Sequence, residues 1–220
     1  MSLARRAAAE FVGTLFLLMV VVGSGIMGER LAQGNMAIAL LANSIATAAG
    51  LFAIIVAVHP VSGAHLNPCV SILAWHEGAI SAAEAALYSV MQILGAAIGV
   101  LLAHVMFSLP AFALGTKDRS TAGEFVAEIV ATAGLLAVIR LARTHGVAAT
   151  AAAIACYIGS AYWFTSSTSF ANPAVTLARA LTDSFAAIRP GDVPAFIGAQ
   201  LIGTALVILV ARLEARKRPG

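Results

Sequence analysis

The chain contains the stretch Ser169-Phe-Ala-Asn-Pro-Ala-Val-Thr-Leu-Ala-Arg179, and a near copy of its first part lies upstream in Gly63-Ala-His-Leu-Asn-Pro-Cys-Val-Ser71. In each copy an Asn-Pro pair is followed by small or apolar residues. Asn is a favoured N-cap residue, and Pro is favoured at the first helical position, where no backbone N–H is needed. The two copies therefore predict short helices over Asn67–Gly78 and Asn172–Leu181.

The composition is typical of an integral membrane protein. Of the 220 residues, 60% are hydrophobic and 10% are charged, and the mean hydropathy is +0.94. The net charge of +3 comes from residues at the ends of apolar segments, so membrane topology explains it better than binding to nucleic acid. The first apolar segment contains Glu10 and is followed by no small-residue cleavage site. We therefore interpret it as a span and not as a cleavable signal.

Six apolar segments have about the ~20 residues that a bilayer core requires. They are Ala7–Met27, Met36–His59, Ala82–Leu109, Gly123–Arg143, Val147–Phe164 and Pro194–Arg212. The two Asn-Pro helices lie between the second and third segments and between the fifth and sixth, and each is long enough for about half a bilayer. We predict re-entrant half-helices. The loops before them, Pro60–Leu66 and Phe164–Ala171, are irregular backbone that a membrane tolerates only where it lines a cavity.

Positive residues predict the orientation. Eight of the thirteen Lys and Arg residues fall on one side of the six-span arrangement, and such an excess marks the cytoplasmic side. These eight are Arg5, Arg6, Arg140, Arg143, Arg212, Arg216, Lys217 and Arg218. We therefore expect a multi-pass protein of the inner (plasma) membrane with both termini in the cytoplasm.

The two halves of the sequence resemble each other. Ala9-Glu10-Phe-Val-Gly-Thr14 matches Ala127-Glu128-Ile-Val-Ala-Thr132, the Asn-Pro stretches match, and Gln92-Ile-Leu-Gly95 matches Gln200-Leu-Ile-Gly203. An odd number of spans in each half makes the halves enter the membrane from opposite sides. We predict one all-α channel domain over residues 1–220, built as an inverted 3+3 repeat of about 1–115 and 120–220.

These landmarks resemble those of the aquaporin, or major intrinsic protein, family over essentially the whole chain. The resemblance rests on Glu10, Thr14, Gln92, Glu128 and Gln200 together with the two Asn-Pro motifs. It implies six transmembrane helices and two half-helices that meet N-terminus to N-terminus at the bilayer centre. It also implies a homotetramer with one pore in each subunit. The pore motifs are then Asn67-Pro68-Cys69 and Asn172-Pro173-Ala174.

Two helix N-termini that meet in this way favour neutral solutes over cations. Each helix N-terminus carries about half a positive charge, and the Asn67 and Asn172 amides offer donors to a passing oxygen. A neutral hydroxylated solute is held, while a cation meets a barrier. Loop carbonyls supply acceptors along the wall. The carbonyls that we expect to line the pore belong to Gly63, Ala64, His65, Ser167, Thr168 and Ser169.

Several polar groups allow two interpretations. Glu10 and Glu128 lie within apolar spans, where a carboxylate needs a partner; the resemblance implies that they anchor the loops, and the alternative is a proton relay. The His65 side chain either props its loop or acts as a pH gate. Cys69 stands where the family usually has Ala, so it is either a tolerated small residue or a reactive thiol next to the pore. The favoured interpretation is the structural one in each case.

The resemblance also assigns an outer selectivity filter, but this chain departs from the usual pattern. Most family members carry Arg directly after the second Asn-Pro-Ala, and here that residue is Val175. Counting back from the Asn residues places Thr47 and Ser160, or Gly159 if the register slips, in the filter, with Ser169 as its fourth member. The predicted filter is wide and uncharged. Arg179, one turn beyond Val175, is expected to stay clear of the filter and to stabilise the half-helix or its outer end.

This filter predicts passive passage of water, glycerol-like polyols and neutral metalloid acids such as arsenite and methylated arsenicals. The chain resembles a bacterial subset of the family that is associated with arsenic resistance and carries Val at the filter position. A water-selective aquaporin, a coupled secondary transporter and a purely structural membrane protein are the alternatives. The sequence has no constellation typical of an enzyme, and its Cys and His residues have no spacing typical of a disulfide framework or a metal site. We expect no cofactor, no metal and no nucleic-acid partner.

Overall fold

The computed structural model describes residues 1–216, and within them the fold consists of helices and connecting loops without strands. Six helices are long and apolar enough to span a membrane. They are α1 (Leu3–Leu31), α2 (Met36–Ser62), α4 (Ala82–Met106), α5 (Ala122–Ala142), α6 (Val147–Phe164) and α8 (Val193–Arg216). The two shorter helices are α3 (Pro68–His76) and α7 (Pro173–Arg179), and 3-10 turns lie at Arg143–His145 and Pro190–Asp192.

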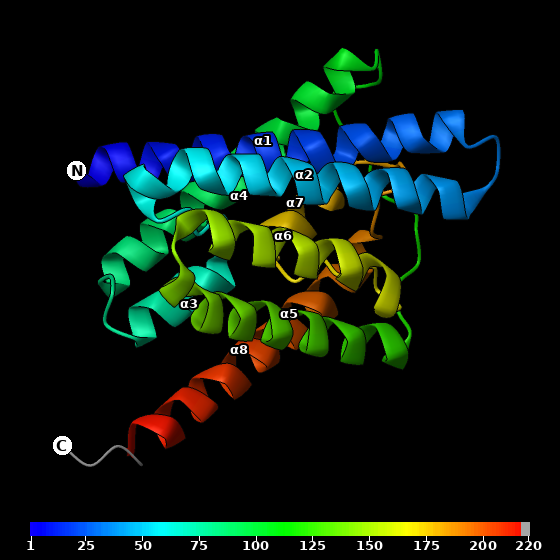
Figure 1. Ribbon diagram of the computed structural model, residues 1–220. Helices are drawn as coiled ribbons and strands as arrows, with labels where there is room; N and C mark the ends of the chain where they lie inside the picture. Colours follow the sequence, from blue (N-terminus) through cyan, green and yellow to red (C-terminus); the bar gives the residue numbers. More distant parts are fainter. Residues whose placement is uncertain (217–220) are drawn as a thin grey trace.

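The predicted spans correspond one to one with the long helices, with shifts at their ends. Helix α2 continues through Pro60 to Ser62, and ends where Gly63 adopts the left-handed conformation with φ +91°. Helix α4 stops at Met106, three residues before the predicted end, and Ser108 then has φ +55°. Lys217 and Arg218, which contributed to the predicted orientation, lie outside the described residues. The N-terminus and the last described turn of α8 lie on the same side of the molecule (Figure 1).

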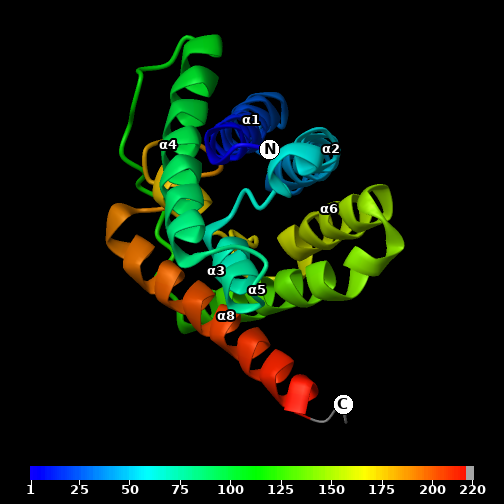
Figure 2. The same ribbon diagram turned by 90° about the vertical axis from the view of Figure 1, so that its left-hand side faces the viewer.

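Packing follows the predicted twofold pattern. Helix α1 packs against α2 and α4, and α5 packs in the same way against α6 and α8, while α2 and α6 join the two halves. Viewed from one end, α3 lies near the centre among the long helices (Figure 2), and α7 packs against α4 and α8. Each half-helix also contacts the last long helix of the other half, α3 against α8 and α7 against α4. The two halves therefore interlock through their half-helices.

Glycines allow the closest of these contacts. A Cβ atom added to Gly95 would lie 2.2 Å from the Phe11 carbonyl oxygen, and one added to Gly99 would lie 2.3 Å from that of Leu15. In the other half, a Cβ atom on Gly203 would lie 2.7 Å from the Ile129 carbonyl oxygen. The small residues that the sequence places at helical spacing thus permit close backbone approach between helices, as is common in membranes.

Candidate functional site: a pore between two half-helices

The two half-helices begin as their Asn-Pro motifs predict. Asn67 Oδ1 accepts from the backbone N–H of Cys69 at 2.9 Å, and Asn172 Oδ1 accepts from those of Ala174 and Val175 at 2.9 and 3.3 Å. The Nδ2 group of each Asn amide donates to the opposite half of the molecule. Asn67 Nδ2 donates to the Ala171 carbonyl at 2.7 Å, and Asn172 Nδ2 donates to the Leu66 carbonyl at 2.8 Å. The two helix N-termini therefore meet, each fixed by the loop of the other.

The loop before α3 is held by one buried carboxylate. Glu10 accepts from the Ser62 hydroxyl at 2.6 Å and from the backbone N–H groups of His65 and Leu66 at 2.9 and 2.6 Å. Gln92 Nε2 donates to the same carboxylate at 2.8 Å. These charged acceptors hold a loop in which Leu66 has φ +53°, a conformation unfavourable for a residue with a side chain.

The second half repeats this network. Glu128 accepts from the Ser167 hydroxyl at 2.6 Å and from the backbone N–H groups of Phe170 and Ala171 at 2.8 and 2.9 Å. Gln200 Nε2 donates to Glu128 at 2.6 Å. The glutamates thus make the loop contacts that were expected of anchors, and both are fully buried among these donors.

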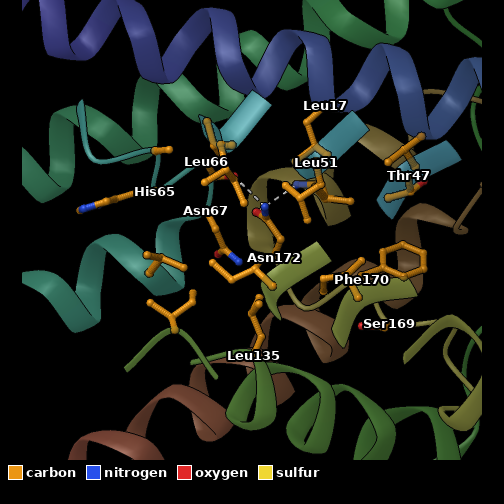
Figure 3. Close-up of a pocket in the computed structure, with 18 of the residues that line it drawn as sticks. Leu17, Thr47, Leu51, His65, Leu66, Asn67, Leu135, Ser169, Phe170 and Asn172 are labelled. Carbon is orange, nitrogen blue, oxygen red and sulfur yellow. Dashed lines mark hydrogen bonds between the residues drawn. The ribbon is translucent and has the colours of Figure 1, made fainter. Parts of the chain in front are cut away.

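A cavity of about 70 Å³ lies beside the junction of the two half-helices. That volume is several times the ~10–15 Å³ that one water molecule needs. Asn67 and Asn172 lie at its middle, with His65 toward one end and Thr47, Ser169 and Phe170 toward the other (Figure 3). Much of the remaining wall is aliphatic, from Leu17, Val21, Leu51, Ile55, Val70, Leu135, Ile139, Ile154 and Ile158. A solute that enters therefore meets a few polar groups on an otherwise apolar wall.

Three of the four predicted filter residues line this cavity, and one does not. Thr47, Ser169 and Val175 are on its wall. Ser160 is exposed on the outer side of α6, where its hydroxyl donates to the Tyr157 carbonyl at 2.8 Å. The prediction for Ser160 is therefore wrong, and Gly159 does not replace it, because a Cβ atom there would meet Ala48 of α2 at 3.2 Å.

The fifth span instead contributes Tyr162. Its hydroxyl lies 3.2 Å from the Thr47 hydroxyl, and its side chain lines the cavity. Ile154, Ile158 and Tyr162 follow one another at four-residue spacing on one helix face, whereas Ser160 is about 200° around the helix from Ile158. This spacing was visible in the sequence and identifies the pore-facing side of α6.

Arg179 also lines the cavity, contrary to expectation. Its side chain is almost fully buried at 2% exposure, its Nε donates to the Ala186 carbonyl, and its guanidinium lies 3.4 Å from the centroid of the Phe170 ring. The prediction of an uncharged filter is therefore wrong, because the wall carries a cation, and the wall also includes a large aromatic side chain, Tyr162, that was not predicted.

Six residues were predicted to line the pore with their carbonyls. Three of them, Ala64, His65 and Ser169, are on the cavity wall, but Gly63, Ser167 and Thr168 are not among the described residues that form it. The Ser167 carbonyl accepts from Arg119 Nη1 at 2.8 Å. Arg119 is buried in the loop before α5, and this burial lowers the pKa of its guanidinium. The sequence did not reveal this structural role of Arg119, because its hydrogen-bond acceptors are in loops that are distant in the sequence.

His65 and Cys69 have structural surroundings. His65 Nδ1 lies 3.1 Å from the Ser71 hydroxyl, and its ring packs edge-on against Tyr88 at 5.2 Å. The Cys69 thiol points toward the Gln200 carbonyl at 3.9 Å and is not on the cavity wall. Within the described part of the chain, no group of three or more His, Cys, Asp and Glu side chains could hold a metal ion.

Known proteins are similar to this chain in sequence and fold. The major intrinsic protein (MIP) family matches residues 1–162. The chain belongs to this family. It is 43% identical over 210 residues to aquaglyceroporin AqpS of Rhizobium meliloti (strain 1021), an alignment that covers 96% of this chain and 90% of that protein.

Two further relatives share less sequence with this chain. Aquaporin TIP1-2 of Zea mays is 35% identical over 138 residues, which cover 60% of this chain and 54% of that protein. The X-ray structure of the aquaglyceroporin from Plasmodium falciparum superimposes with a TM-score of 0.73 at 20% identity, covering 94% of this chain and 95% of that one. The aquaporin fold and the class of channel for water and small solutes are thereby established for this multi-pass membrane protein.

Proposed function

We propose that this family member is a passive channel for small neutral hydroxylated solutes, namely glycerol-like polyols and neutral metalloid acids such as arsenite and methylated arsenicals, together with water. The observation that carries the proposal is the polar set on the cavity wall. Asn67 and Asn172 lie at the junction of the half-helices, and three hydroxyl-bearing residues, Thr47, Tyr162 and Ser169, are on the same wall. Solutes with several hydroxyl groups exchange bonds to water for bonds to such groups.

The aliphatic wall supports solutes larger than water. The carbon backbone of a polyol gains contact with side chains such as Leu51, Ile55 and Ile158, while its hydroxyls turn to the polar set. A water-selective channel is the alternative, and Tyr162 favours it to the extent that its ring narrows the path. The name of the Rhizobium relative, an aquaglyceroporin, agrees with the wider range.

A coupled secondary transporter is disfavoured by the surroundings of its only candidate carboxylates. Glu10 and Glu128 are each occupied by hydroxyl, amide and backbone donors, and neither lines the cavity. We further propose the arrangement that the family resemblance implies: an inner-membrane homotetramer with cytoplasmic termini and one pore in each subunit, made of inverted repeats at about 1–115 and 120–220.

Purified protein in proteoliposomes tests the proposal. Glycerol uptake measured by light scattering should exceed that of bare lipid and should follow the glycerol gradient alone. An imposed pH or sodium gradient should leave the uptake rate unchanged. Uptake driven against a glycerol gradient by either ion would require the transporter interpretation, and permeability equal to that of bare lipid would require a structural role.

A further inference from the structure

Arg179 is a buried cation whose charge has no carboxylate beside it. Among the described residues, no Asp or Glu oxygen lies within ion-pair distance of its guanidinium. Its only hydrogen bond to the described protein runs from Nε to the Ala186 carbonyl. Burying an unpaired charge is costly unless some group or solvent compensates it. The guanidinium lines the cavity, so water or a solute in the cavity can compensate its charge.

The guanidinium reaches the depth of the filter although Arg179 lies at the end of α7. Side chains of a helix lean toward its N-terminus, and therefore over the preceding turn. In α7 that turn contains Val175. The contact with the Phe170 ring at 3.4 Å fixes this position, because Phe170 directly follows the filter residue Ser169.

A second arginine near the same ring has a different role. Arg119 lies 4.8 Å from the Phe170 centroid, but its Nε donates to the Ala187 carbonyl at 2.9 Å and its Nη1 to that of Ser167 at 2.8 Å. Its Nη1 is also 4.0 Å from a Glu124 oxygen, and its side chain does not line the cavity. Arg119 therefore ties loops together, whereas the terminal nitrogens of Arg179 remain available to a solute.

Ser169 provides an independent sign of a solute position. Ser169 is a buried residue on the cavity wall, and its hydroxyl has no hydrogen-bond partner among the described residues. Buried hydroxyls are nearly always paired, with protein or with water. Ser169 and Arg179 are on the same cavity wall, so an unpaired hydroxyl and a cation are both positioned for oxygens of a solute in the cavity.

We propose that Arg179, together with Ser169, forms the outer site of this channel that binds solutes and excludes cations. Arg179 thereby takes the role of the Arg that most family members carry at the position of Val175. The inference rests on the proposed channel function and names a residue that determines its selectivity. The guanidinium is permanently charged and planar, and it donates several N–H bonds. It repels cations through a medium of low dielectric constant and holds the acceptor oxygens of polyols and oxyacids.

The test compares three variants with the unmodified channel in proteoliposomes. Arg179→Gln removes the charge and keeps donors, Arg179→Lys keeps the charge, and Lys117→Gln removes a nearby positive charge that does not line the cavity. Proton and sodium leak is followed with pH-sensitive and sodium-sensitive dyes, alongside glycerol permeability. Arg179→Gln should leak cations at least about tenfold faster, equivalent to about 1.4 kcal/mol of barrier. Lys117→Gln should stay within about twofold of the unmodified channel. Arg179→Lys should leak fewer cations than Arg179→Gln, because it keeps the positive charge, but should conduct glycerol more slowly than the unmodified channel, because it loses the planar guanidinium.

The outcomes separate this inference from the proposed function. Unmodified protein with no glycerol permeability above bare lipid would reject the channel proposal itself. Unmodified protein that conducts glycerol, combined with an Arg179→Gln leak that is no greater than that of Lys117→Gln, would reject only the role of Arg179.

A chemical probe keeps the inference testable if Arg179→Gln does not fold. Ser169→Cys, in a background of Cys69→Ala and Cys156→Ala, retains Arg179 and is exposed to iodoacetate or 2-bromoethylamine. Relative to a free thiol in solution, the anionic reagent should be favoured at least about threefold. A preference for the cationic reagent, or no reaction with either, would contradict a positively charged site that is open to solutes.

Discussion

The hydroxyls of Thr47 and Tyr162 lie 3.2 Å apart and join α2 of the first half to α6 of the second across the wall of the cavity. Tyr162→Phe removes one of these hydroxyls and keeps the ring. We expect glycerol permeability to fall about fivefold relative to water, since one neutral hydrogen bond contributes about 1 kcal/mol. Stopped-flow light scattering of proteoliposomes measures both rates.

Ser160→Ala is the matched control, because the Ser160 hydroxyl is on the outer side of the same helix. The glycerol-to-water ratio of this variant should equal that of the unmodified channel. If Ser160→Ala changed the ratio as much as Tyr162→Phe does, the pore-facing side of α6 would have to be reassigned.

Val175→Arg adds a second guanidinium to a wall that already carries Arg179. It should narrow the filter and reduce glycerol and arsenite permeability about tenfold or more relative to water, in line with the effect of steric changes in binding pockets. Val175→Leu, which adds bulk without charge, separates size from electrostatics. An equal loss of all solutes would indicate a blocked or misfolded pore, and unchanged ratios in a folded variant would place the narrowest point elsewhere.

Glu10→Gln and Glu128→Gln replace charged acceptors by amides of similar shape. Each glutamate accepts from two backbone N–H groups, a Ser hydroxyl and a Gln amide, so the substituted amide turns a donor toward donors. A buried donor left unpaired costs about 1–3 kcal/mol. The yield of folded protein and its melting temperature in detergent should therefore fall, while the solute ratios of the folded fraction stay the same. Normal yield combined with loss of a pH-dependent flux would point to a proton relay.

Lys117 offers a prediction about pH. Burial in the loop before α5, with Arg119 and Arg179 nearby, lowers the pKa of its ammonium from 10.5 to about 8. Between these values the unfolded chain binds the extra proton and the folded protein does not, so the free energy of unfolding should increase as pH rises from about 8 to 10.5. The chain has only one other lysine, Lys217. Reductive methylation of a Lys217→Arg variant with a ¹³C label marks Lys117 and the N-terminal amine, and the Lys117 signal is the one that a further Lys117→Arg substitution removes. This signal should titrate near 8, and a midpoint near 10 would contradict the buried environment.

The helical architecture and the motif contacts could be predicted because they depend on local or repeated signals. Apolar segment lengths gave the six spans, and the Asn-Pro pairs gave the half-helix starts. The two glutamates were assigned as anchors from their repeated positions and family resemblance, and the hydrogen bonds to both loops agree.

The errors in the filter have a common cause, since each concerns the direction of a side chain. Counting residues along α6 located the right turn but not the right face, and selected Ser160 in place of Tyr162. Counting along α7 placed the Arg179 backbone one turn beyond Val175 but missed that its side chain leans back. Arg119 could not be assigned because its acceptors, Ser167 and Ala187, come from loops that meet only in the folded protein.

The permeability of one reconstituted preparation to water, glycerol and arsenite tests the central claim most directly. All three solutes should cross faster than through bare lipid vesicles, and the unmodified channel should conduct glycerol without any ion gradient. An increase in water permeability alone, with glycerol and arsenite at the level of bare lipid, would contradict the claim that the path between Asn67 and Asn172 conducts polyols and neutral metalloid acids.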